Sequence, residues 1–222
     1  MPINRLQQFV LRVSRRVPAL NKKLCSLWNI NTKAYWDGEY SAATADQKWS
    51  EDKRLYFYKL AETALPNGNA TILDAGSALG AGGRYLMDQN SNWKIEGLDF
   101  SAAACERAVI KTHCVDLLKE NVQGQYDYVL AIQTLEHFPS PNPIIAKLFA
   151  AAREALILTV PYAGQLSPTH PVSFDENSFA DYEHVNVKLS ERIIPKTGQK
   201  KTDMLAVLSK RPFEFSESSG KA

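Results

Sequence analysis

One segment restricts the fold of this chain more than any other: a short apolar run that passes directly into a glycine-rich turn. The run covers residues 71–75, and Gly76 and Gly80 follow it just before a stretch, 81–90, with a helical pattern. Glycine removes the side chain where a backbone must pass close to a ligand. The segment therefore predicts a strand, a ligand-binding turn and a helix in succession.

Strand-like and helical segments alternate after this turn. Strand patterns cover residues 93–99, 113–115, 126–132 and 155–160, and helical patterns cover 102–110 and 143–153. Such alternation is typical of βαβ units with a mostly parallel sheet. The end of the chain differs, because residues 184–194 and 203–210 are both strand-like and only a turn-rich segment separates them. This pattern predicts a terminal antiparallel hairpin.

An acidic residue at the end of the second strand indicates what the turn binds. Asp99 stands nineteen residues after Gly80, and a carboxylate there can accept hydrogen bonds from both hydroxyls of a ribose. The dinucleotide fingerprint G-x-G-x-x-G is not met, because Ala78 stands at the middle position of G-x-A-x-G. No Lys-Ser/Thr pair follows, which excludes a P-loop, and Asp74 would repel a pyrophosphate. A different nucleoside-containing cofactor is therefore expected.

These residues resemble the first motif of the class I S-adenosylmethionine-dependent methyltransferases, D-x-G-x-G-x-G after a strand. Asp74, Gly76 and Gly80 match this motif, whereas Ala78 departs from it. The resemblance continues in order over roughly residues 70–210. It implies a Rossmann-like α/β fold, in which a seven-stranded, mostly parallel sheet is flanked by helices and its last strand is antiparallel.

The resemblance also implies that S-adenosylmethionine is the cofactor and assigns roles to single residues. Asp99 would bind the ribose, Phe100 would pack on the adenine, and Asp116 would accept a hydrogen bond from the adenine amino group. The end of the fourth strand, at Gln133, would face the methionine part. The expected cofactor-binding residues are Asp74, Gly76, Ser77, Gly80, Asp99, Phe100, Asp116, Leu117 and Gln133.

Methyl transfer needs mainly the alignment of acceptor, methyl and sulfur, because the leaving sulfur becomes neutral. A hydroxyl or carbon acceptor also needs a general base, and the candidates are His137 and His170. The alternative for His137 is a hydrogen-bonded structural histidine. We expect a small-molecule or glycan-intermediate acceptor, because the short loop around residues 162–182 leaves little protein for binding a macromolecule.

The three cysteines argue against a disulfide framework and against a zinc site. Cys25, Cys105 and Cys114 form no CxxC pair, and an odd, unpatterned set is typical of a reducing compartment. We therefore expect no metal and a cytoplasmic location. No stretch of about 18 uninterrupted apolar residues is present in the sequence.

The first part of the chain is a basic arm. Residues 1–36 carry seven of the 26 basic residues and none of the 24 acidic ones, so the remainder has a net charge of −5. An acidic body argues against binding nucleic acid. Within the arm, residues 3–17 predict an amphipathic helix. Its apolar arc consists of Ile3, Leu6, Phe9, Val10, Val13 and Val17.

Three interpretations of this helix remain open. It can attach the protein to an anionic membrane, as a peripheral protein on the inner face. It can instead pack on the acidic catalytic domain, or belong to a transit peptide. The predicted organisation is a helical arm at residues 1–34, a helical cap at 35–69, the S-adenosylmethionine-binding methyltransferase domain at 70–212 and a flexible tail at 213–222.

Two other functions remain as alternatives to methyl transfer. The first is a catalytically inactive, methyltransferase-like binding or scaffold protein, which the departure at Ala78 favours. The second is an NAD-dependent oxidoreductase, which the incomplete glycine pattern disfavours.

Overall fold

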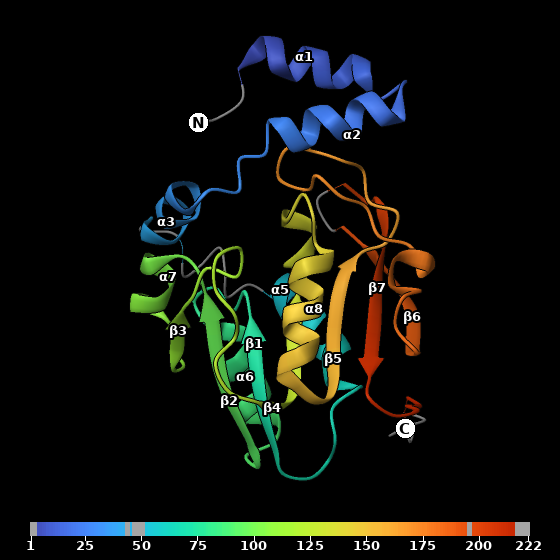
Figure 1. The fold of residues 1–222 in the computed structure, drawn as a ribbon. Coiled ribbons are helices and arrows are strands. Elements are labelled where there is room, and N and C mark those ends of the chain that lie inside the picture. The colour runs from blue at the N-terminus through green and yellow to red at the C-terminus, as the bar shows by residue number, and fades with distance from the viewer. Residues whose placement is uncertain (1–3, 43–44, 46–51, 195–196, 216–222) are drawn as a thin grey trace.

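The computed structural model describes residues 4–42, 45, 52–194 and 197–215. A seven-stranded sheet in the order β3-β2-β1-β4-β5-β7-β6 forms its centre (Figure 1). Strands β1 to β5 pair in parallel, and β7 runs antiparallel to both β5 and β6. The predicted fold, with its antiparallel last strand, is confirmed. The strands are β1 (Ala70–Ala75), β2 (Trp93–Asp99), β3 (Thr112–Cys114), β4 (Tyr126–Ile132), β5 (Ala152–Pro161), β6 (His184–Ile193) and β7 (Lys200–Ser209).

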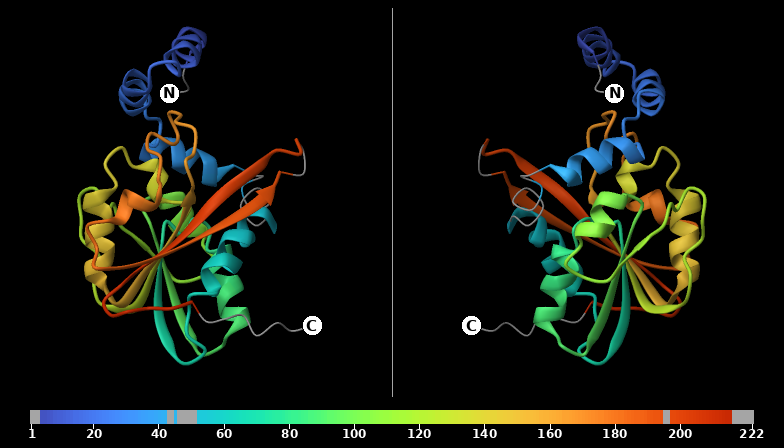
Figure 2. Two further views of the ribbon diagram at one scale, coloured as in Figure 1. Left: turned by 90° about the vertical axis from the view of Figure 1, so that its right-hand side faces the viewer. Right: turned by 90° about the vertical axis from the view of Figure 1, so that its left-hand side faces the viewer.

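Helices cover both faces of the sheet (Figure 2). Helices α5 (Asp52–Glu62) and α6 (Ala81–Gln89) lie on one face, and α8 (Asn142–Ala151) lies on the other. The adjacent residues Ile72 and Leu73 of β1 are both buried but belong to different apolar clusters, because successive side chains of a strand point to opposite faces. Burial of such a side chain contributes about 1.5–3 kcal/mol. The central strands thus present apolar side chains to both faces of the sheet, and helices pack on each face, which gives a helix–sheet–helix arrangement of three layers.

Two short helices form an N-terminal hairpin that projects from the body (Figures 1 and 2). Helix α1 (Arg5–Ser14) begins after a capping box of Asn4 and Gln7. Pro18 is the first residue of α2 (Pro18–Leu27), where its fixed φ favours helix. The hydroxyl of Ser14 donates a 2.9 Å hydrogen bond to Oδ1 of Asn21, which joins the two helices.

The apolar side of α1 faces solvent. Leu6, Phe9, Val13 and Val17, here called the apolar stripe, are 50–70% exposed. Leu11, on the other side of the helix, is the buried apolar residue and faces the hairpin interior. The stripe therefore does not pack on the catalytic domain, and that interpretation was wrong. Ile3 lies outside the described residues.

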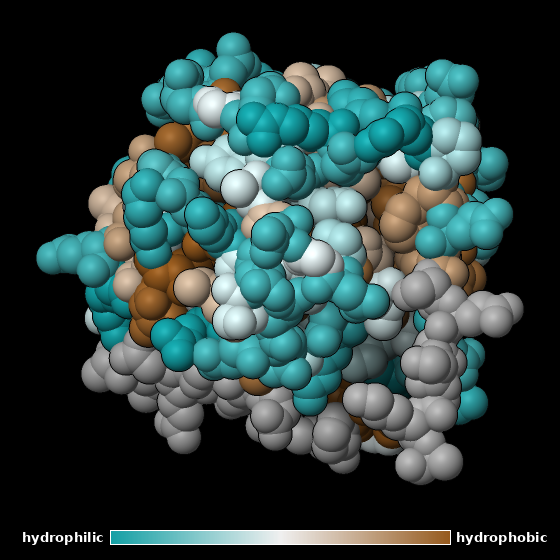
Figure 3. Space-filling view, turned by 90° about the horizontal axis from the view of Figure 1, so that it is seen from below, coloured by the Kyte–Doolittle hydropathy of each residue, from teal (hydrophilic) through white to brown (hydrophobic). Residues whose placement is uncertain are grey.

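Four further short helices lie in the described part of the chain. They are α3 (Lys33–Ser41), α7 (Ala102–Arg107), and the 3-10 helices η1 (Leu135–His137) and η2 (Glu176–Phe179). Helix α7 ends earlier than predicted because Ala108 is extended. The end opposite the N-terminal hairpin is mainly hydrophilic (Figure 3). Of the expected tail, Phe213 and Phe215 pack against the core, and residues 216–222 lie outside the described part.

No helix within the described residues is long and apolar enough to cross a membrane.

Candidate functional site

A cavity of about 500 Å³ lies where the parallel strands end. Residues that follow β1, β2 and β4 line it, among them Gly76, Asp99 and Gln133. Helices α3 and α5 and the loop that contains His170 contribute further parts of its wall. The crevice at the carboxyl ends of the strands is the place where open α/β sheets bind their ligands.

The turn after β1 has a strained, closely packed backbone. Gly76, Ala78 and Gly80 all have positive φ, at 78°, 52° and 79°. A Cβ on Gly76 would lie 2.4 Å from Oγ1 of Thr134, so no larger residue fits without displacing the end of β4. Alanine at positive φ costs roughly 1–2 kcal/mol. Ala78, which departs from the motif, therefore adopts the backbone conformation that is typical of the glycine expected at this position.

Asp74 lies behind the cavity wall instead of in it, and so does Gly80. The Asp74 carboxyl is fully buried and accepts a 2.9 Å hydrogen bond from the hydroxyl of Tyr58. Burial raises the pKa of Asp74 to about 7, against the opposing effect of this hydrogen bond. The Tyr58 ring fills the space above Gly82, where a Cβ would come within 2.0 Å of it. Asp74 and Tyr58 therefore pack behind the turn, on the side that faces the protein interior.

Asp99 joins the turn to the second strand. Its carboxylate accepts hydrogen bonds from the backbone N–H of Ala78 at 3.0 Å and of Ser101 at 2.9 Å. Burial raises the pKa of Asp99. Each carboxylate oxygen retains a second lone pair for a ligand hydroxyl. The carboxylate is thus held in place by backbone and lines the cavity.

Most other predicted cofactor residues reach the same cavity. Those that line it are Gly76, Ser77, Asp99, Phe100, Asp116, Leu117 and Gln133. Asp116 forms an ion pair with Lys119 at 2.8 Å on the outer side. Gln133 has a φ of 51°, and within the described residues its buried Nε2 has no hydrogen-bond partner. An unpartnered amide in a cavity wall is available to a ligand.

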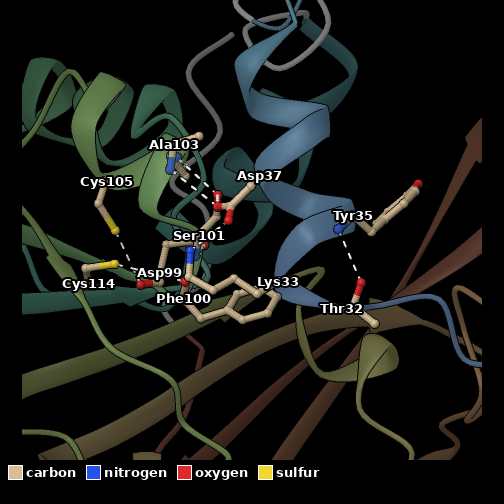
Figure 4. A network of polar contacts seen from close by, with 11 residues as sticks. Thr32, Lys33, Tyr35, Asp37, Asp99, Phe100, Ser101, Ala103, Cys105 and Cys114 are labelled. Carbon is tan, nitrogen blue, oxygen red and sulfur yellow. Dashed lines mark hydrogen bonds and ion pairs between the residues drawn. The ribbon is translucent and has the colours of Figure 1, made fainter. Parts of the chain in front are cut away.

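Helix α3 is fastened over the cavity by polar contacts (Figure 4). Oδ1 of Asp37 accepts a 2.6 Å hydrogen bond from the Ser101 hydroxyl outside the helix, and Oδ2 forms a 2.7 Å ion pair with Lys33 within α3. Trp36 and Tyr40, one turn apart, stack with ring centroids 5.6 Å apart and line the cavity. Trp36 was not among the residues predicted for the site.

The cavity wall beside Trp36 holds both predicted catalytic histidines. The rings of His137 and His170 lie 4.9 Å apart, and Trp36 packs edge-on against His137 at 5.1 Å. Nδ1 of His137 donates a 2.7 Å hydrogen bond to the Thr169 carbonyl, so Nε2 carries the lone pair of the neutral ring. Burial, with His170 nearby, lowers the pKa of His137 to about 4. Burial also lowers the pKa of His170.

Sequence reasoning missed Glu136, which precedes His137 in η1. Its side chain is buried and lines the cavity beside the two histidines. Burial raises the pKa of Glu136 to about 8. The amide of Asn31, also missed, donates to the carbonyls of His137 and Thr169 at 3.1 and 2.9 Å. Asn31 thus joins the N-terminal segment to this end of the cavity.

Residues 73–155, which include the turn, Asp99 and the end of β4, match a family model described as a methyltransferase domain. This match supports the resemblance of these residues to the class I methyltransferases. No match was found among curated protein sequences.

Solved structures with the methyltransferase fold superpose on most of the chain. A chain of the complex between the Haloferax volcanii Trm112 methyltransferase activator and the putative methyltransferase has a TM-score of 0.63 at 13% identity, covering 78% of this chain and 97% of that one. The plantazolicin methyltransferase BpumL, in complex with a monoazolic desmethylPZN analog and SAH, has a TM-score of 0.60 at 14% identity, covering 87% and 99%.

A third similar structure is magnesium protoporphyrin IX methyltransferase (ChlM) from Synechocystis PCC 6803 with bound SAM. Its TM-score is 0.55 at 16% identity, and the match covers 84% of this chain and 96% of that one. At these identities the likeness describes the fold alone.

Proposed function

We propose that this protein binds S-adenosylmethionine in the cavity and transfers its methyl group to a small molecule or a glycan intermediate. One observation carries the proposal: Asp99, Asp116 and the strained turn at Gly76 line one cavity at the carboxyl ends of the strands in a methyltransferase domain. Solved neighbours of the same fold contain SAM or SAH.

The cofactor would lie across the ends of β1, β2 and β4. Asp99, fixed by two backbone N–H groups, would accept hydrogen bonds from the ribose hydroxyls, and Phe100 beside it would cover the adenine. Asp116 would accept from the adenine amino group. The methionine part would then extend toward Gln133, whose unpartnered Nε2 can donate to a carboxylate.

The acceptor would bind between α3 and the loop around His170. Trp36 supplies an apolar wall there, and His137 offers its Nε2 lone pair. The buried, neutral His137 is a weak base, so it suits orienting a hydroxyl better than removing its proton unaided. A cavity of about 500 Å³ that also holds the cofactor leaves room for only part of an acceptor. This supports a small molecule, or the end of a glycan intermediate.

We further propose that the protein is cytoplasmic and docks reversibly on the inner, anionic face of a membrane through α1. The apolar stripe is exposed on a helix whose arm carries only basic charges. Such helices lie in the interface with their apolar side buried among the lipids. Each basic residue near an anionic surface adds about 1 kcal/mol. Phe9 and the valines of the stripe supply the apolar contribution.

Calorimetric titration with S-adenosylmethionine, S-adenosylhomocysteine and NAD separates this proposal from its alternatives. We expect both sulfur compounds to bind with one site per chain, and NAD not to bind. A labelled methyl donor incubated with metabolite and glycan-intermediate fractions should then release S-adenosylhomocysteine. Binding without turnover in every fraction would favour the scaffold, and NAD binding would favour an oxidoreductase.

A further inference from the structure

Three side chains with metal-binding atoms meet at the acceptor end of the cavity. Glu136, His137 and His170 can each place one oxygen or nitrogen within 4.8 Å of the other two. Glu136 and His137 come from η1, whereas His170 comes from the loop after β5. A tetrahedral ion with ligands at 2.0–2.2 Å holds them about 3.4 Å apart. Modest rotations of the three side chains would therefore bring their ligand atoms from within 4.8 Å to this separation.

The carboxyl of Glu136 has no evident role in holding the fold together. The residue is 2% exposed, and its Oε2 has no hydrogen-bond partner among the residues that the structure describes. A buried carboxyl is costly unless a partner or a metal ion offsets the lost hydration. The imidazoles beside it belong to His137 and His170, whose ring nitrogens can each offer a lone pair to an ion.

The orientation of His137 is the one that metal-binding histidines adopt. Such a ring typically donates one N–H to a backbone carbonyl, which fixes the tautomer and leaves the other nitrogen for the ion. His137 does this through Nδ1 and the Thr169 carbonyl, and Asn31 binds that same carbonyl. The supporting contacts of a metal ligand are thus already present.

We propose that Glu136, His137 and His170 bind a divalent transition-metal ion of the zinc class. Two imidazoles and one carboxylate suit zinc, iron(II) or manganese(II) better than magnesium, which prefers oxygen ligands. Three protein ligands leave a coordination position open toward the cavity, as in catalytic metal sites.

The role of this ion rests on the proposed methyl transfer. An acceptor hydroxyl at the open position would lose its proton to solvent, because a bound cation lowers the pKa of a coordinated oxygen. The oxygen would then form a bond to the methyl carbon, and the carbon–sulfur bond would break. The electron pair of that bond stays on sulfur, which gives S-adenosylhomocysteine. The ion would thereby do the work of a strong base, which is absent among the described residues that line the cavity.

The test uses the full chain, freed of metal with a chelator and titrated calorimetrically with Zn²⁺ alone. We expect one Zn²⁺ per chain, and at least a tenfold weaker affinity in His170→Ala and in Glu136→Gln. His113→Ala is the matched control, because His113 pairs with Glu96 on β2, away from the cavity. Cys114→Ser is a second control, because the exposed thiol is a competing soft ligand.

Retention of the wild-type affinity in His170→Ala, or its loss in Cys114→Ser or His113→Ala, would overturn the proposal. So would the absence of Zn²⁺ binding to the wild-type chain up to high micromolar concentration. Thermal melting of each variant detects a folding defect. Titration of the metal-free protein with S-adenosylmethionine is independent of this result, so failure of the metal site and failure of the proposed function give different outcomes.

Discussion

The Tyr58 hydroxyl on α5 donates a 2.9 Å hydrogen bond to the buried Asp74 carboxyl at the end of β1. Both side chains are almost fully enclosed, and the Tyr58 ring also occupies the space above Gly82. A helix that precedes the sheet in sequence therefore determines the position of the glycine turn. The first consequence concerns stability, because the Asp74 carboxyl is buried where its charge is unfavourable.

Asp74→Asn should become increasingly stabilising as the pH rises. The pKa of Asp74 is raised to about 7 in the folded state, so between about pH 4 and pH 7 the unfolded chain ionises first and wild-type stability falls. Each unit of pKa difference corresponds to about 1.4 kcal/mol. Urea unfolding of both proteins at pH 5 and pH 8 measures the change.

Asp127→Asn is the matched control for this experiment. Hydrogen bonds from Thr71 lower the pKa of Asp127, so its contribution to stability is present above the unfolded pKa and should not decline toward pH 8. A stability difference at Asp74 that is the same at both pH values would contradict the burial argument.

Asp99→Ala should weaken the binding of S-adenosylmethionine. It removes two charge-assisted hydrogen bonds to the ribose, each worth on the order of 1.5–3 kcal/mol. We expect at least a tenfold rise in the dissociation constant by titration calorimetry. Asp88→Ala, an exposed change on α6, is the control. An unchanged dissociation constant in Asp99→Ala would contradict the assignment of Asp99 as the residue that binds the ribose.

Gly76→Val should abolish cofactor binding. The residue has a φ of 78°, and its Cβ would lie 2.4 Å from the Thr134 hydroxyl oxygen. A branched side chain resists this backbone conformation and would displace the cavity wall. Gly38→Ala is the control, because nothing lies within 4 Å of its Cβ position. Normal binding by the Gly76→Val variant, measured by calorimetry, would refute the assigned geometry of the turn.

Ala78→Gly should be tolerated and should leave the affinity equal or slightly higher. Glycine relieves the cost of alanine at a φ of 52°, roughly 1–2 kcal/mol, although it also adds entropy to the unfolded chain. Parallel urea unfolding and cofactor titration separate the two effects. A large loss of affinity would mean that the alanine methyl makes a contact that the ligand needs.

Full-length protein should sediment with vesicles that contain anionic lipid at low salt, whereas a chain that starts at Thr32 should not. Phe9→Ser in the full chain should reduce sedimentation severalfold, because it interrupts the apolar stripe. Leu189→Ser, which alters an exposed leucine on β6, is the matched control. If wild type and the shortened chain both stay in the supernatant, α1 does not bind membranes.

Strands were easier to predict from the sequence than the surroundings of the site. The limits of β2 and β4 match the prediction because β2 alternates apolar and polar residues and β4 ends in an apolar run, and both patterns are typical of strands. Helix α2 was not predicted, because a proline can mark either the end or the beginning of a helix, and Pro18 marks the beginning of this one.

Glu136 and His170 lie close together only because two segments that are distant in the sequence fold next to each other. No local sequence pattern predicts such a contact. The same is true of Trp36, whose contact with His137 joins segments far apart in the sequence. The glycine turn and Asp99 could be predicted without knowledge of the fold because each has a local signal in the sequence.

The side-chain amide of Asn31, shortly after the N-terminal hairpin, donates hydrogen bonds to the carbonyls of His137 and Thr169. The hairpin therefore lies at the end of the molecule where the parallel strands end and the cavity lies (Figure 1). A protein resting on a bilayer through α1 would therefore search for its acceptor in two dimensions. An acceptor held in the leaflet by a lipid tail could be modified there without leaving the membrane. Turnover would then follow the surface density of the acceptor in the vesicle and not its bulk concentration.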